Sequence, residues 1–186
     1  MNYNKQHHLI IENLIQAVSA CLDDTSAFAA AGSKVRLDRY AFTVNDTFRY
    51  PILVFYMALP KVQVNSATEA YTALFMKELY YNNEWDEADP IDINQLKEMW
   101  IPHYFMKYRD RSVPDYNIEE MKTEFFLQEV TGWMETIPIP EDEIRDFEET
   151  HKNAHVINVR NVYAGHNCFG ETDGHYFIAE FGCGYD

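Results

Sequence analysis

The sequence contains few of the residues on which disulfide-bonded or fibrous folds depend. Only three of its 186 residues are cysteines, and no two of them form a Cys-x-x-Cys pair. So small and odd a number argues against a disulfide framework and a structural zinc knuckle, and predicts a protein of a reducing compartment, the cytoplasm. Seven glycines and seven prolines are too few for a fibrous or linker-like chain.

Long apolar runs are also missing. The best candidate, residues 52–59, has eight residues, far short of the roughly 20 that cross a bilayer as a helix. The first eight residues lack an apolar stretch ending in small residues, so we expect no secretory signal. We therefore expect no association with membranes.

Basic residues are scarce, with 15 lysines and arginines against 30 acidic residues and a net charge of −15. This sign of charge repels phosphate backbones and anionic lipid, so we expect no direct binding of nucleic acid. A basic protein surface would instead be attracted.

The negative charge is concentrated in the middle of the chain. Residues 62–154 carry 21 acids and 8 bases, a charge of −13, whereas residues 1–61 carry +1 and residues 155–186 carry −3. Residues 84–92 contain five acids and residues 141–149 contain six. The predicted partner-binding carboxylates are Glu84, Asp86, Glu87, Asp89, Asp92, Glu119, Glu120, Glu124, Glu141, Asp142, Glu143, Asp146, Glu148 and Glu149.

The pattern of apolar residues predicts an α+β fold. Residues 34–44 and 48–59 indicate one hairpin with a turn at 45–47, and 156–164 and 175–181 indicate a second, with 165–174 as its glycine-rich loop. Helical spacing or capping residues occur at 7–22, 66–79, from 92 onwards, at 117–137 and at 141–153. We expect one domain over residues 1–186, an antiparallel sheet of about four strands packed against four to five helices.

The end of the chain holds the residues with metal-binding or nucleophilic chemistry. His166, Cys168 and His175, with Asp173 as a fourth candidate, belong to the predicted hairpin loop and supply nitrogen, sulfur and oxygen donors that zinc accepts. Their spacing is not that of a standard zinc site. The alternative is a polar loop whose histidines face water, with no cofactor.

Two further pairings are conceivable in this region. In the predicted hairpin Cys183 lies beside His155, which would activate the thiol as a nucleophile. His151 and His155 are four residues apart and could bind a metal if the preceding helix continued that far. The alternative for Cys183 is a small packed apolar residue.

No phosphate-binding, dinucleotide-binding, zinc-protease or serine-hydrolase motif is present. The sequence therefore favours an acidic protein-interaction module that binds a basic protein surface, as an inhibitor, an immunity-type protein or a mimic of nucleic-acid charge would. The alternatives are a small metal- or thiol-dependent enzyme that uses the C-terminal loop, and a small-ligand binder with a pocket between sheet and helices. Whether the protein is an enzyme stays open.

Overall fold

The computed structural model describes Gln16, Ala20, Asp23, Asp24 and residues 39–45, 52–82, 106–107, 110–114, 118–162 and 165–183. Contacts divide the chain into two compact units, residues 1–36 with 63–116, and residues 37–62 with 117–186. The single domain expected over 1–186 stays a prediction. Nearly all of the predicted helix 7–22 and the helix expected after residue 92 lie outside the described residues.

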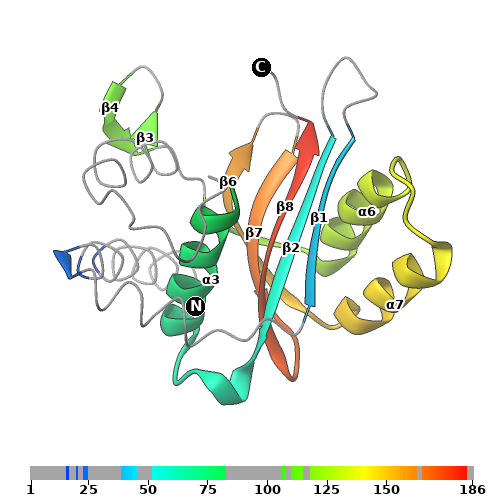
Figure 1. The fold of residues 1–186 in the computed structure, drawn as a ribbon, viewed down its shortest axis with the longest axis horizontal. Helices are drawn as coiled ribbons and strands as arrows, with labels where there is room; N and C mark the ends of the chain where they lie inside the picture. Colours follow the sequence, from blue (N-terminus) through cyan, green and yellow to red (C-terminus); the bar gives the residue numbers. More distant parts are fainter. Residues whose placement is uncertain are drawn as a thin grey trace. The chain divides into compact units, whose positions relative to one another are not determined.

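The second unit is built on an antiparallel sheet (Figure 1). Its strands are joined in the order β1-β2-β8-β7-β6-β5, and every pair of neighbours is antiparallel. The fold is therefore α+β, as predicted, with six strands instead of about four. The strands are β1 (Arg39–Asn45), β2 (Ile52–Pro60), β5 (Glu119–Met121), β6 (His155–Val162), β7 (Gly165–Glu171) and β8 (His175–Cys183).

Strand β2 lies inside the sheet because its apolar run suits burial on both faces. It pairs with β1 from Asn45↔Ile52 to Arg39↔Ala58, and with β8 from Ile52↔Cys183 to Pro60↔His175. Residues 54–59 are all buried. The predicted pairing of these two strands is confirmed, although Asn45, which was predicted in the turn, is still part of β1. Residues 34–38 and 46–51 lie outside the described residues, and η1 (Lys61–Gln63) follows β2.

The predicted glycine-rich loop 165–174 is wrong, because most of it forms β7. This strand lies between β6 and β8 and pairs with both, so β6 and β8 are not neighbours. Its glycines meet a packing requirement: a Cβ at Gly170 would lie 2.3 Å from the Phe177 ring, and one at Gly165 would meet the Phe181 carbonyl oxygen. Glycine in a strand often marks such a close approach.

The predicted helix 117–137 begins later than expected. Residues 119–121 form β5, which pairs with β6 from Glu119↔Asn158 to Met121↔Val156. Helix α6 (Thr123–Met134) follows, with Lys122 as its N-cap. Helix α7 (Glu141–His151) begins at residue 141, as predicted, and ends two residues before the predicted end at 153. Pro140 O accepts hydrogen bonds from the amides of Glu143 and Ile144.

Helices α6 and α7 cover one face of the sheet (Figure 1). Their inward side chains and the facing strand residues form one continuous core. Its centre is aromatic: Phe126 of α6 lies 5.7 Å from Phe177 and 6.0 Å from Phe181 between ring centroids. The core side chains are Val54, Tyr56, Ala58, Met121, Phe126, Val130, Met134, Ile137, Ile144, Phe147, Ala154, Val156, Cys168, Phe177, Ala179 and Phe181.

The first unit contains helix α3 (Ala67–Asn82) and the strands β3 (Met106–Lys107) and β4 (Asp110–Pro114), which pair with each other. The predicted capping residues act at the start of α3. Ser66 Oγ accepts a hydrogen bond from the Glu69 amide, and the Glu69 carboxylate accepts one from the Asn65 amide, 2.9 Å away. Among the described helices, none has the length and apolar character needed to cross a membrane.

Candidate functional site

Helix α7 buries its apolar residues and exposes its acidic ones. Ile144, Phe147 and His151 recur at helical spacing and are buried against the core. The six acidic residues of the helix are all exposed: Glu141, Asp142, Glu143, Asp146, Glu148 and Glu149. Three of them lie in the first turn, where a negative charge interacts favourably with the helix dipole and stabilises the helix.

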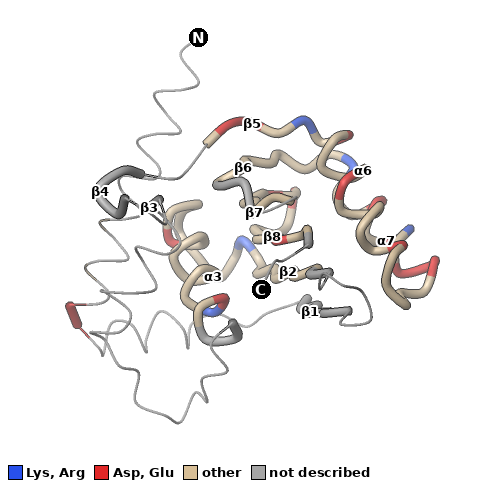
Figure 2. Tube along the Cα trace, turned by 90° about the horizontal axis from the view of Figure 1, so that it is seen from above, with Lys and Arg blue, Asp and Glu red and all other residues tan. Residues whose placement is uncertain are grey.

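Acidic residues also occur along β5 and α6, as Figure 2 shows, and most of them are exposed. Glu124 belongs to α6, and Glu135 is the residue that follows this helix. Glu119 and Glu120 belong to β5, and all four side chains are exposed. We call these four residues and the six of α7 the acidic surface. Residues 118–153 contain eleven acidic side chains and three basic ones, Lys122, Arg145 and Lys152.

Two carboxylates of the acidic surface, Glu149 and Glu120, lie close to basic side chains. Lys152 Nζ lies 2.7 Å from Glu149 Oε2, and both side chains are mostly exposed. This ion pair therefore contributes little to the stability of the fold. His155 Nε2 lies 3.6 Å from Glu120 Oε1. The other predicted partner-binding residues, Glu84, Asp86, Glu87, Asp89 and Asp92, lie outside the described residues.

An aromatic side chain is exposed within the acidic surface. Phe125, at the start of α6, is 44% exposed. Its ring meets that of His166 edge to face at 5.9 Å. His166 Nδ1 lies 3.2 Å from Asn158 Oδ1. Burial lowers the pKa of His166, and the carboxylates of Glu129 and Glu119 partly oppose this effect.

We expect His166 to titrate below the ordinary histidine pKa of about 6.5 in an NMR pH titration. The folded protein binds the proton of His166 less well than the unfolded chain does. The contribution of His166 to stability is therefore complete at a pH above the pKa of the unfolded chain. It is lost as the pH falls through the lower pKa of the folded protein. Glu129→Gln should lower the pKa further, whereas Glu135→Gln should leave it in place. An unchanged titration in Glu129→Gln would contradict this electrostatic account.

The structure does not bring the predicted zinc ligands together. His166 lies opposite Phe181 in β8, six residues from His175, which corresponds to about 20 Å along a strand. Asp173 is in the β7–β8 turn. Among the described residues, no group of three or more histidine, cysteine or acidic side chains is placed to hold a metal ion.

Cys168 is a core residue. It is fully buried, and its Sγ lies 3.9 Å from Met121 Sδ. Burial, together with the negative charge of Glu180, raises the pKa of this thiol far above its usual range. Cys168 therefore stays protonated and has neither the thiolate nor the access that a nucleophile or metal ligand needs.

The two other predicted pairings also fail on geometry. Cys183 lies opposite Ile52, not beside His155, because β7 separates β6 from β8. His155 pairs with Glu171 of β7, and Glu171 pairs with Tyr176 of β8. Tyr176 is seven residues from Cys183, so these two residues of β8 are about 23 Å apart along the strand. His151 is buried at the end of α7, whereas the His155 side chain is 46% exposed.

A buried histidine–tyrosine pair was not predicted. His151 Nδ1 lies 2.7 Å from the carbonyl oxygen of Phe147, and His151 Nε2 lies 2.8 Å from the Tyr56 hydroxyl. Since a carbonyl can only accept, Nδ1 carries a proton, and in the neutral imidazole Nε2 accepts a hydrogen bond from the Tyr56 hydroxyl. The Phe147 ring stacks on the imidazole at 4.1 Å. The pair fixes the end of α7 to β2.

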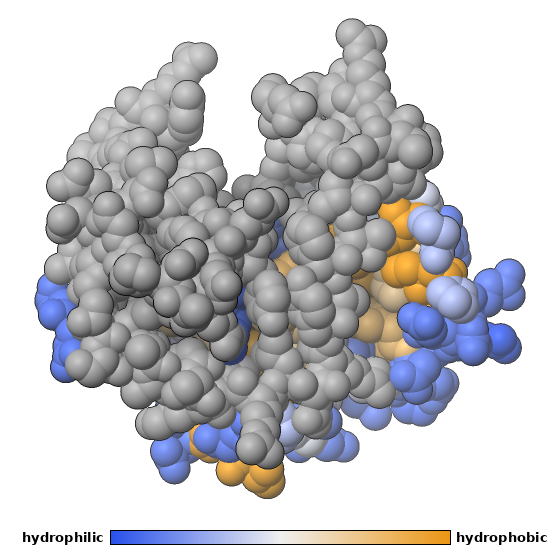
Figure 3. Space-filling view, in the orientation of Figure 1, coloured by the Kyte–Doolittle hydropathy of each residue, from blue (hydrophilic) through white to orange (hydrophobic). Residues whose placement is uncertain are grey.

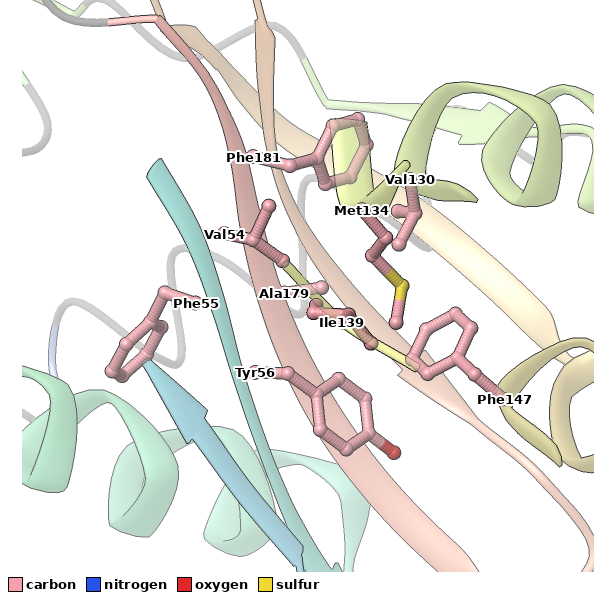
Figure 4. A pocket seen from close by; sticks show the side chains of 9 residues that line it. All are labelled: Val54, Phe55, Tyr56, Val130, Met134, Ile139, Phe147, Ala179 and Phe181. Carbon is pink, nitrogen blue, oxygen red and sulfur yellow. The ribbon is translucent and has the colours of Figure 1, made fainter. Parts of the chain in front are cut away.

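The described residues of the second unit line an apolar pocket and a polar depression. The apolar pocket has a volume of about 50 Å³ and lies between the sheet and the helices α6 and α7 (Figure 4). A wider polar depression of about 240 Å³ lies between the end of α7 and the β7–β8 turn. Asp173 and Glu149 line this depression together with Lys152 and small polar residues.

Comparison with protein-family models, with curated proteins and with solved structures finds no match for this chain.

Proposed function

We propose that the protein is an acidic interaction module whose acidic surface binds a basic protein surface. The arrangement of α7 carries the proposal, because all six of its carboxylates are exposed while Ile144, Phe147 and His151 are buried against the core. An inhibitor, an immunity-type protein or a mimic of nucleic-acid charge would use such a surface. Complementary charge steers the encounter of two proteins and sets their register.

Phe125 supports the proposal as a contact residue within this surface. Interfaces of high affinity combine charged margins with a few aromatic side chains near their centre. A lysine or arginine of the partner would find both a ring face and the nearby carboxylates at Phe125.

The test measures binding of a lysine- and arginine-rich peptide by stopped-flow fluorescence at about 50 mM and about 300 mM salt. We expect association to slow steeply as salt rises. The combined substitution Asp142→Asn, Glu143→Gln and Glu148→Gln removes three exposed charges of α7. It should slow association at low salt by about tenfold, because electrostatic steering accounts for factors of this size.

A control removes negative charge from the first unit. The combined substitution Asp23→Asn and Asp24→Asn changes the net charge from −15 to −13, at exposed residues that are not members of the acidic surface. Its association rate should stay close to that of the unaltered protein. Equal slowing in both variants, or binding that does not respond to salt, would count against an acidic interaction site on α7.

A further inference from the structure

The apolar pocket beneath α6 and α7 is distinct from the acidic surface. Its walls come from β2, α6, α7 and β8 and from the α6–α7 connection. Figure 4 shows that Met134, Phe147 and Tyr56 lie on the helix side of the sheet, whereas the Phe55 side chain points to the other side. The pocket is lined by Val54, Phe55, Tyr56, Val130, Met134, Ile139, Phe147, Ala179 and Phe181.

The lining has almost no polar surface. The Tyr56 hydroxyl is the polar side-chain group among these residues, and it is bonded to His151 Nε2 at 2.8 Å. A water molecule needs two to four polar partners to be stable in a cavity. The pocket therefore favours an apolar occupant over water.

Burial of the lining residues locates the mouth of the pocket. Ile139 is partly exposed, whereas the other eight are buried. Met134 and Phe147, at 8%, are the most exposed of the buried lining residues. In Figure 3, hydrophobic atoms lie beside hydrophilic ones in the region of α6 and α7. Ile139 immediately precedes Pro140 and the acidic first turn of α7, so the mouth is close to negative charge.

Size and charge then define the ligand. The volume of about 50 Å³ is smaller than the ~150 Å³ of an engineered cavity that binds benzene. The interior therefore admits a narrow alkyl group and not an aromatic ring. The thioether of Met134 can adjust to its shape. The carboxylates of Glu141, Asp142 and Glu143 near the mouth disfavour an anionic head group.

We propose that this pocket binds the end of an unbranched alkyl chain that carries an uncharged head group. The chain end lies between Val130, Met134 and Ala179, and the head group emerges beside Ile139.

Methyl NMR spectroscopy of the full chain with 1-butanol as the probe tests this proposal. Saturable shifts are expected for the methyl groups of Met134, Val130 and Val54, which line the pocket. Pentanoate has the same butyl chain and a negative charge, so we expect at least about tenfold weaker binding. Shifts that rise linearly without saturation, or equal binding of butanol and pentanoate, would overturn the proposal.

Two substitutions distinguish binding in the pocket from binding elsewhere. Ala179→Val adds two methyl groups to the floor and should abolish the saturable shifts. Val130→Ala widens the pocket and should admit benzene, which keeps the test informative if Ala179→Val does not fold. Ile157→Val, a buried change on the opposite face of the sheet, is the matched control. Loss of butanol binding in this control, or its retention in a folded Ala179→Val protein, would refute the assignment.

Discussion

Phe126→Ala is expected to lower the free energy of unfolding by about 3–5 kcal/mol, the usual cost of removing a buried phenylalanine ring. Phe126 is fully buried, and its ring centroid lies within 6.4 Å of those of Phe147, His151, Phe177 and Phe181. The surrounding rings come from α7 and β8, so the void cannot close without movement of both elements. Urea unfolding followed by circular dichroism measures the change.

Phe125→Ala is the matched control, because the neighbouring ring is 44% exposed. Its truncation should cost less than about 1 kcal/mol, since little of the ring leaves water on folding. A similar decrease in the free energy of unfolding in the two variants would mean that the Phe126 side chain is not buried in the core.

Gly170→Ala is expected to destabilise the protein by about 1–3 kcal/mol, the typical cost of excess volume in a packed core. The added Cβ would lie 2.3 Å from Cζ of Phe177, directly across the β7–β8 pair. The Phe177 ring cannot swing away freely, because it is fully buried and lies 4.9 Å from His151 and 5.7 Å from Tyr56 between ring centroids. Thermal and urea unfolding measure the loss.

Two further variants separate this clash from a general effect of alanine. Gly132→Ala in α6 meets no atom within 4 Å, so it should stabilise the helix by roughly 0.5–1 kcal/mol. In the Gly170→Ala background, Phe177→Leu should cost less than it does in the unaltered protein, because it also relieves the contact. Additive effects of the two substitutions would contradict the proposed clash.

The elements with strong local patterns could be predicted from the sequence. The apolar run of β2 indicated an internal strand, Ser66 and Glu69 marked the start of α3, and the acidic residues of α7 marked an exposed helix face. In each case the residues that decide the structure are neighbours in the sequence. The predicted α+β class followed from these segments, and it is confirmed.

The errors arose where distant residues decide the structure. Gly165 and Gly170 favoured a loop by composition, but their lack of a side chain is needed because β8 approaches closely. Glu119 and Glu120 favoured a helix, yet they pair with β6 across more than 35 residues. The shift of the helix start from 117 to Thr123 accompanies the exposure of Phe125.

The candidate sites show the same contrast between features that neighbouring residues decide and features that distant residues decide. Acidic residues clustered in the sequence also cluster on α7, since a helix keeps its neighbours together. The zinc and thiol pairings assumed that β6 and β8 are adjacent, and β7 removes that adjacency. The Tyr56–His151 hydrogen bond joins residues 95 positions apart. Nothing in the local sequence around either residue signals it.

The short β5 strand has a consequence for solubility. In the described part of the chain it forms one border of the sheet, with only three residues, two of which are exposed glutamates. An open border of this kind could otherwise recruit a strand from a second molecule and begin aggregation. Its brevity and like-charge repulsion between copies act as a guard against fibril growth from this border.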